Sequence, residues 1–186
     1  MAAQKRKKKK KAGSIATSVI KTGLFILLIL VVTYLLVTYV FRKTIVHNVS
    51  MMNTLYDGDN IIMDELSYNT GDPKRYDIIC FKSYKERDLL IKRVIGLPGE
   101  TVHIEDGEIF INGKKIKDKA GLEKIENPGL ASGDIELLDD EYFVIGDNRD
   151  ESIDSRSEDV GNVRRREILG KAVLVIWPVK HIKVIK

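Results

Sequence analysis

The pattern of hydrophobic and polar residues divides the chain into two parts. Thr22 to Phe41 is a run of twenty residues without a charge. As an α-helix it would be about 30 Å long, which matches the hydrocarbon core of a bilayer. A cleavable signal peptide is one alternative, but the run is long for that purpose, and no small-x-small cleavage site follows it. A buried soluble helix is disfavoured because the run has no polar face, so we predict a transmembrane anchor over 22–41.

Basic residues concentrate before this run and predict its orientation. Residues 1–21 hold eight Lys and Arg and no acidic residue, whereas only Arg42 and Lys43 follow the run closely. Because cytoplasmic flanks carry the excess of positive charge, we expect 1–21 to be a basic cytoplasmic tail beside membrane lipid. The protein would then be single-pass in the cell membrane, with an extracytoplasmic domain over 44–186.

The remainder of the chain has a mainly β pattern. Short apolar, β-branched segments recur, and Asp106-Gly107 and Asn112-Gly113 are typical hairpin turns. Only Val160–Leu169 has a pattern compatible with a helix, and the polar stretch at about 114–140 predicts a loop or a small subdomain. The expected strands are Thr44–Val49, Asn60–Met63, Ile78–Phe81, Leu89–Ile95, Thr101–Ile104, Glu108–Ile111, Tyr142–Ile145 and Lys171–Trp177.

Composition excludes some functions of this domain. The whole chain has a net charge of +4, but residues 22–186 carry 23 of the 31 Lys and Arg and all 27 Asp and Glu, a net charge of −4. The basic character therefore belongs to the tail and does not indicate a nucleic-acid partner. The single cysteine, Cys80, excludes an intramolecular disulfide, and its apolar surroundings indicate a buried thiol. His47, His103 and His181 are isolated and form no metal-binding motif, so we expect ordinary structural or surface histidines and no metal.

Two segments suggest nucleophilic catalysis without a histidine. Ser50 lies in N-V-S-M-M-N-T-L, and Lys92 lies in L-I-K-R-V-I-G-L-P-G-E. In a regular strand Lys92 shares a face with Leu90 and Val94, while Arg93 beside it would point to solvent. Lysine in a strand usually points to solvent, but apolar neighbours would favour the neutral amine that a general base requires. A serine and such a lysine can together form a hydrolase.

A third segment, Gly146 to Arg156, is dense in Asp, Asn and Ser. Such a segment can be a turn-rich loop whose side chains bond to the backbone. It can also support a catalytic lysine, with Ser152 bonded to the amine and Asp154 paired with Arg156. The residues alone leave both interpretations open.

Together the three segments resemble type I signal peptidase, the membrane-bound Ser-Lys leader peptidase of bacteria, in a Gram-positive-like form. The matching motifs are S-M-x-x-T-L with Gly58-Asp59 after it, K-R-V-I-G-L-P-G-E from Lys92, and G-D-N-R-D-x-S-x-D-S-R from Gly146. The resemblance implies a signal-peptidase-type β-fold, with Ser50 as nucleophile and Lys92 as general base. Ser152 then positions the lysine, and Asp154 and Arg156 are structural.

The resemblance also implies a substrate. Secreted preproteins with small residues at positions −1 and −3 would add as a strand beside Ser50 and be cut without a cofactor. By position, the pocket for these residues would be lined by Val46, Met51, Leu55 and Ile91.

Two residues near Ser50 depart from the family pattern. Asn53 stands where proline is usual, and Asn48 stands where serine or glycine is usual. In a regular strand Asn48 would share the face of Ser50, so its amide would join the Ser50 backbone N–H as a second oxyanion donor.

Two other functions compete with this interpretation. A self-processing Ser-Lys protein like the SOS repressors is disfavoured by the membrane anchor. A membrane-tethered binding protein with a decayed site is disfavoured by the presence of both Ser50 and Lys92. The sequence does not fix the oligomeric state.

Overall fold

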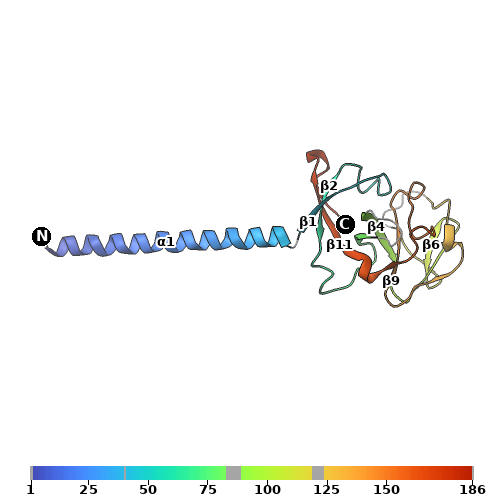
Figure 1. Ribbon diagram of the computed structural model, residues 1–186, viewed down its shortest axis with the longest axis horizontal. Coiled ribbons are helices and arrows are strands. Elements are labelled where there is room, and N and C mark those ends of the chain that lie inside the picture. The colour runs from blue at the N-terminus through green and yellow to red at the C-terminus, as the bar shows by residue number, and fades with distance from the viewer. Residues whose placement is uncertain (1, 40, 83–88, 119–123, 186) are drawn as a thin grey trace. The chain divides into compact units, whose positions relative to one another are not determined.

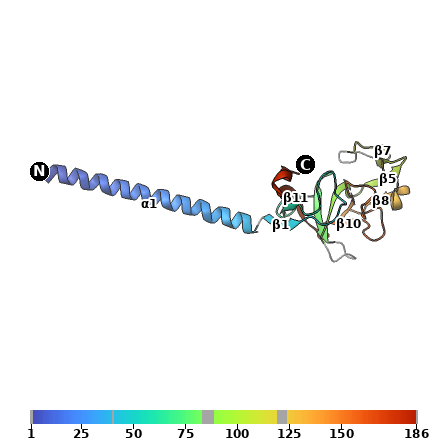
Figure 2. The same cartoon turned by 90° about the horizontal axis from the view of Figure 1, so that it is seen from above.

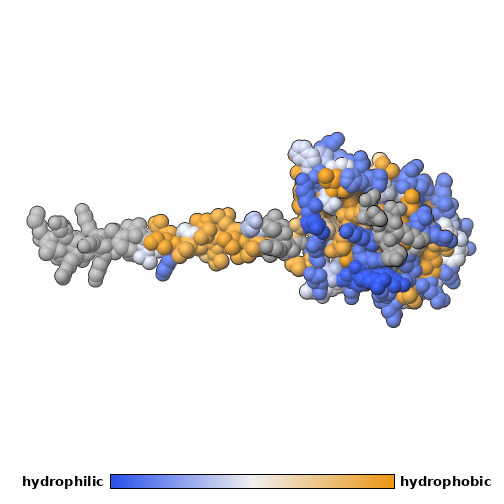
Figure 3. Space-filling view, in the orientation of Figure 1, coloured by the Kyte–Doolittle hydropathy of each residue, from blue (hydrophilic) through white to orange (hydrophobic). Residues whose placement is uncertain are grey.

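The computed structural model describes residues 2–39, 41–82, 89–118 and 124–185, which form two separate units, 1–40 and 41–186. The first unit is one helix, α1 (Ala2–Tyr39). Its most apolar stretch is Thr17–Leu35, with a mean hydropathy of 2.2, and Figure 3 shows this stretch as a hydrophobic band. A helix of this length and composition can cross a membrane. The expected anchor at 22–41 is wrong at its C-terminal end, because Phe41 already belongs to a strand.

The second unit is a β domain, as the sequence predicted, and most of its strands belong to one sheet. The order in that sheet is β1-β2-β11-β3-β4-β9-β10, and β12 pairs with β11. All of the neighbouring pairs are antiparallel. The members are β1 (Phe41–Ile45), β2 (Asn60–Asp64), β3 (Ile78–Lys82), β4 (Leu89–Gly96), β9 (Glu141–Ile145), β10 (Val163–Arg164), β11 (Ile168–Trp177) and β12 (Lys183–Val184).

A smaller sheet of four strands lies at the end of the domain away from β1 and β2 (Figures 1 and 2). Its order is β7-β6-β5-β8. The expected loop or subdomain at about 114–140 contributes its two outer strands and a 3-10 turn, while 119–123 lie outside the described residues. The strands are β5 (Thr101–Glu105), β6 (Glu108–Ile111), β7 (Lys114–Lys115) and β8 (Ile135–Glu136), and the turn is Gly129–Ser132.

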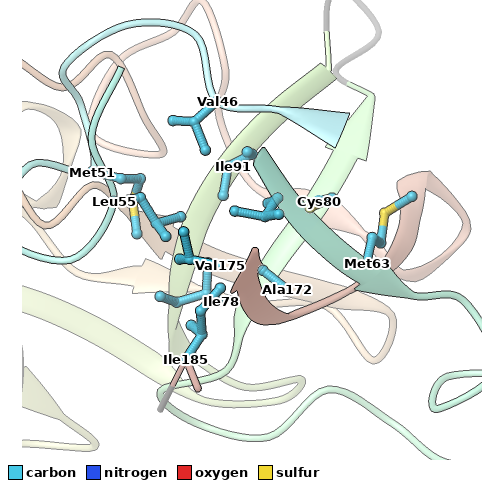
Figure 4. Packing of buried hydrophobic residues seen from close by; sticks show 11 residues of the cluster. Val46, Met51, Leu55, Met63, Ile78, Cys80, Ile91, Ala172, Val175 and Ile185 are labelled. Atoms are coloured by element: carbon cyan, nitrogen blue, oxygen red, sulfur yellow. The ribbon is translucent and has the colours of Figure 1, made fainter. Parts of the chain in front are cut away.

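Alternating side chains fix the faces of these strands. In β2, Ile61 and Met63 are buried while their neighbours are only partly covered, which is the pattern of a half-buried strand. They belong to the largest core cluster, which Figure 4 shows together with residues from β3, β4, β11 and the loop between β1 and β2. That loop, 46–59, is therefore held by its own apolar side chains and not only by the two strands.

Two local predictions are wrong. The strand expected over Thr44–Val49 ends at Ile45, and the segment Val160–Leu169 is not an α-helix. The latter forms the short strand β10 and one 3-10 turn, Arg165–Glu167, before β11 begins at Ile168. Val163 is buried against Tyr142 of β9, so tertiary packing decides the conformation of this segment.

Candidate active site

A pocket of about 640 Å³ lies between two segments that are distant in the sequence. One segment follows β1, and the other is the first half of β4. Three residues from farther along the chain complete its wall, and two of them, Glu151 and Ile153, belong to the loop 146–156. The lining residues are Thr44, Ile45, Val46, His47, Asn48, Val49, Ser50, Met51, Leu89, Leu90, Ile91, Lys92, Glu151, Ile153 and Val160.

Ser50 lies in a turn just after β1 and not in a strand. The residues that follow it form tight turns, in which the N–H groups of Thr54 and Leu55 both donate to the carbonyl of Met51. Asn48 has a φ of 75°, a left-handed conformation that ends the extended backbone before Ser50 is reached. The alternation of faces expected for 48, 50 and 52 is therefore wrong.

Lys92 is buried and touches the Ser50 side chain. Its relative exposure is 3%, and its Nζ lies 2.6 Å from Ser50 Oγ. Burial lowers the pKa of the amine from 10.5 to about 8; Asp154 and Asp147 oppose this shift and Arg156 adds to it. At a pH above 8 the neutral amine predominates and can accept the serine proton. The pair has the contact that an activated nucleophile requires.

Arg93, expected in solvent, is instead buried to the same extent as Lys92. Its Nε and Nη2 each donate to Asp147 at 2.8 Å, and its Nη1 donates to the carbonyl of Tyr76 at 2.7 Å. A carboxylate that accepts two parallel bonds stabilises a buried guanidinium. The expectation failed because this partner comes from a loop 54 residues away.

The same loop also holds the backbone of the serine turn. The Asn148 backbone N–H donates to the carbonyl of Ser50 at 3.1 Å, and its side-chain amide donates to the carbonyl of Val49 at 3.1 Å. Asn148 was not among the residues expected in the site. Its place inside the G-D-N-R motif was the one signal in the sequence that could have found it. Both of its acceptors are backbone carbonyls, and a sequence pattern does not reveal contacts to the backbone.

Asp154 and Arg156 brace this loop from inside. Asp154 is fully buried and accepts from Arg156 Nε and Nη2 at 2.9 Å and from the Gly146 backbone N–H at 3.0 Å. Arg156 also donates to the carbonyls of Arg149 and Asn127. The pair therefore links three separate points of the loop and its neighbouring segment.

Ser152 does not make the hydrogen bond to Lys92 that the sequence analysis expected. Its Oγ is buried and has no hydrogen-bond partner among the described residues. It packs against Gly146, where an added Cβ would collide with both Ser152 Oγ and the carbonyl oxygen of Ser50. The glycine thus permits the close approach of the two loops, and Ser152 fills the space beside it.

Two groups were expected to donate hydrogen bonds to the oxyanion, the Ser50 backbone N–H and the Asn48 side-chain amide, and their surroundings differ. Within the described ranges the Ser50 backbone N–H has no hydrogen-bond acceptor, so it is available to a ligand. The Asn48 backbone N–H donates to Asp57, whereas its exposed side chain lines the pocket. Asn53 has a φ of 82°, which a proline cannot adopt, so this turn differs from one that contains proline.

Three of the four residues expected in the substrate pocket line it, namely Val46, Met51 and Ile91. Leu55 does not line it and is fully buried in the core cluster, where Figure 4 shows it beside Met51. His47 also lines the pocket, although the expected strand would have turned it away from Ser50. In the described ranges no three His, Cys, Asp or Glu side chains lie close enough to hold a metal ion.

Comparisons with known proteins show the family of the chain. The family model described as signal peptidase, peptidase S26, matches residues 19–177. Signal peptidase I P of Bacillus subtilis subsp. natto is 32% identical over 165 residues, covering 85% of this chain and 89% of the relative. Signal peptidase I of Bacillus caldolyticus is 37% identical over 155 residues, covering 77% and 83%. A solved signal peptidase I from Enterococcus faecalis is 32% identical, with a TM-score of 0.45, and 57% of this chain and 98% of that chain are covered.

Proposed function

Since the chain belongs to the signal peptidase family, peptidase S26, a family of serine endopeptidases, we propose that Ser50 is its nucleophile and Lys92 its general base. The observation that carries this proposal is the 2.6 Å contact between Ser50 Oγ and the buried Lys92 Nζ. Signal peptidase I acts on secreted preproteins, and cleavage would release the signal peptide from the mature chain.

The reaction divides into two steps. In the first, Lys92 takes the hydroxyl proton while Ser50 Oγ bonds to the carbonyl carbon of residue −1, and the leaving amine then takes that proton. In the second, Lys92 takes a proton from water while the water oxygen bonds to the ester carbon, and Lys92 then returns that proton to Ser50 Oγ as the ester bond breaks and the new carboxyl end of the signal peptide leaves. The amine must be neutral at the start of each step, so activity should rise with pH through about 8.

The negative oxygen formed in each step needs hydrogen-bond donors. We assign the Ser50 backbone N–H as one donor. The Asn48 side-chain amide is proposed as the second because it is exposed and lines the same pocket, even though the strand that would have aligned it with Ser50 ends at Ile45. Asn48→Ala should lower kcat about a hundredfold with little change in KM, because the amide acts on charge that develops only in the transition state. An unchanged kcat would remove Asn48 from this role.

The substrate is proposed to lie extended in the pocket between 44–51 and 89–92. Alternate side chains of an extended peptide point the same way, so residues −1 and −3 would both face the apolar wall. Val46, Met51 and Ile91 form that wall and are nearly covered by their own packing. We propose that this covered wall accepts small residues at both positions.

The membrane placement is proposed on charge. The basic residues before α1's apolar stretch favour a cytoplasmic N-terminus and anionic lipid contacts, so the β domain would be extracytoplasmic in the cell membrane. Labelling of single cysteines introduced in the tail and in the β domain of intact cells tests this orientation. Modification of the tail by an impermeant reagent would contradict it.

The activity is tested with the full chain in detergent micelles and a preprotein that carries an Ala-x-Ala site. We expect cleavage directly after the second alanine and its loss in Ser50→Ala and Lys92→Ala. A preprotein with tryptophan at −1 is the matched control for the pocket. Normal cleavage by either variant would overturn the assignment, whereas cleavage of the tryptophan substrate would overturn only the specificity.

A further inference from the structure

The loop that carries Ser50 is closed at its base by Asp59. The backbone N–H of Val46 donates to the carbonyl of Asp59 at 2.8 Å, and the Gly58 N–H donates to the carbonyl of Val46 at 3.0 Å. Asp59 Oδ2 accepts the Tyr56 backbone N–H at 2.9 Å. One fully buried carboxylate therefore stands where the two ends of the loop meet.

The other oxygen of this carboxylate is held by a residue near the end of the chain. His181 Nδ1 lies 2.6 Å from Asp59 Oδ1, and the two residues are 122 positions apart. The ring of His181 also packs against Tyr56, with 4.9 Å between the ring centroids. We infer that His181 is a positioning residue that fixes the Ser50 loop through Asp59.

The segment that carries His181 is itself anchored, so it can act as a fixed point. A short 3-10 turn, Val179–His181, places the histidine, and its backbone N–H donates to the carbonyl of Pro178. Farther on, the Ile185 N–H donates to the carbonyl of Val173. Ile185 lies in the same core cluster as Val46, Met51 and Leu55, with Val46 and Ile185 at opposite ends of it in Figure 4.

The free energy needed to leave the Asp59 carboxylate unpaired indicates that His181 holds the Ser50 loop in place. A buried carboxylate oxygen that loses its hydrogen-bond partner is destabilised, and the chain can relieve that cost by moving the carboxylate toward water. Such a movement would loosen the base of the loop, nine residues from Ser50. A shift of about 1 Å at a catalytic group can reduce the rate about a hundredfold. The inference rests on the proposed role of Ser50.

The chain supplies a matched control for this contact. His103 pairs with Asp134 across 3.2 Å in the smaller sheet, and its side chain is exposed to a similar extent as that of His181. It is remote in topology from the Ser50 loop, since β5 belongs to the other sheet. His103→Ala therefore removes a His–Asp contact of similar histidine exposure, but to an exposed carboxylate and away from the loop.

The test measures kcat and KM of the full chain with the preprotein substrate. We expect His181→Ala to lower kcat tenfold to a hundredfold with KM within twofold, and His103→Ala to leave both unchanged. His181→Asn should recover most of the rate, because its amide nitrogen can donate to Asp59 in place of Nδ1. Equal losses in the alanine and asparagine variants, or an unchanged kcat in His181→Ala, would overturn the inference.

Hydrogen exchange provides a readout that does not depend on activity. The Thr54 and Leu55 amides are bonded within the loop and should exchange at least tenfold faster in His181→Ala, but not in His103→Ala. Unchanged exchange would show that His181 does not hold the loop. If exchange accelerates while Ser50→Ala still cleaves the substrate, the tether stands and the proposed nucleophile fails.

Discussion

The two faces of β4 bury one cation each, with opposite consequences. Lys92 faces the pocket and contacts a neutral hydroxyl, whereas Arg93 faces the other way and forms a paired contact with the carboxylate of Asp147. Both have a relative exposure of 3%. Burial without a contacting carboxylate lowers the pKa of Lys92 to about 8, while Arg93 has the partner that a permanent charge requires. Burial therefore lowers the pKa of Lys92 enough to make it a base because no carboxylate of the described residues contacts the amine.

The largest expected effect is on the Lys92 face. Lys92→Met should reduce kcat/KM by a factor on the order of 10⁴ or more, because the serine loses its base. The same change should raise the free energy of unfolding at pH 7 by about 1–3 kcal/mol, since a buried charge is removed. Activity assays and urea unfolding of the full chain in micelles measure the two effects.

The pH dependence of the difference in free energy of unfolding between Lys92→Met and the wild type is the control for this prediction. Between pH 8 and 10.5 the unfolded lysine binds more protons than the folded one, so wild-type stability rises with pH. The difference between Lys92→Met and wild type should therefore narrow across that window. A difference that stays constant with pH would show that the lysine is not destabilised by its burial.

The opposite result is expected on the Arg93 face. Arg93→Met leaves Asp147 buried without its partner and should lower the free energy of unfolding by about 3–5 kcal/mol. Arg93→Lys keeps the charge but loses the paired geometry, so it should cost about 1–2 kcal/mol. If Arg93→Met raised the free energy of unfolding, burial would affect Arg93 in the same way as Lys92, and the contrast between the two faces of β4 would be wrong.

A smaller effect is expected where the loops meet beside Lys92. Gly146→Ala should lower the free energy of unfolding by about 1–3 kcal/mol, because the new methyl group collides with the Ser50 carbonyl and with Ser152. Gly133→Ala is the control, since an added Cβ there meets no atom within 4 Å. Equal thermal midpoints for the two variants would contradict the close packing at Gly146.

The sequence predicted the strands that alternate simply. Glu108–Ile111 matches β6 at both ends, and Asn60–Met63 misses only the last residue of β2. It could not predict where β1 ends, because a single left-handed residue, Asn48, interrupts an otherwise extended pattern. A β-branched run indicates a strand but carries no information about the residue at which its backbone turns.

Some contacts of the candidate site could be predicted from the sequence and others could not, for a related reason. Motif resemblance brought Ser50 and Lys92 together although 42 residues separate them. The partners of Arg93 and His181 were missed because the resemblance assigned them no role and no periodicity connects residues 54 and 122 positions apart. Ser152 was expected at Lys92, but its orientation depends on the packing of Gly146, which a motif does not report.

The central claim is that the Lys92 amine loses its proton near neutral pH. Its pKa can be measured directly by NMR titration of the ε-carbon in the full chain with labelled lysine, using Lys92→Met to assign the signal. We predict a pKa of about 8 for this lysine, below the ordinary lysine value of 10.5. A Lys92 signal that titrates together with the exposed lysines would contradict the account.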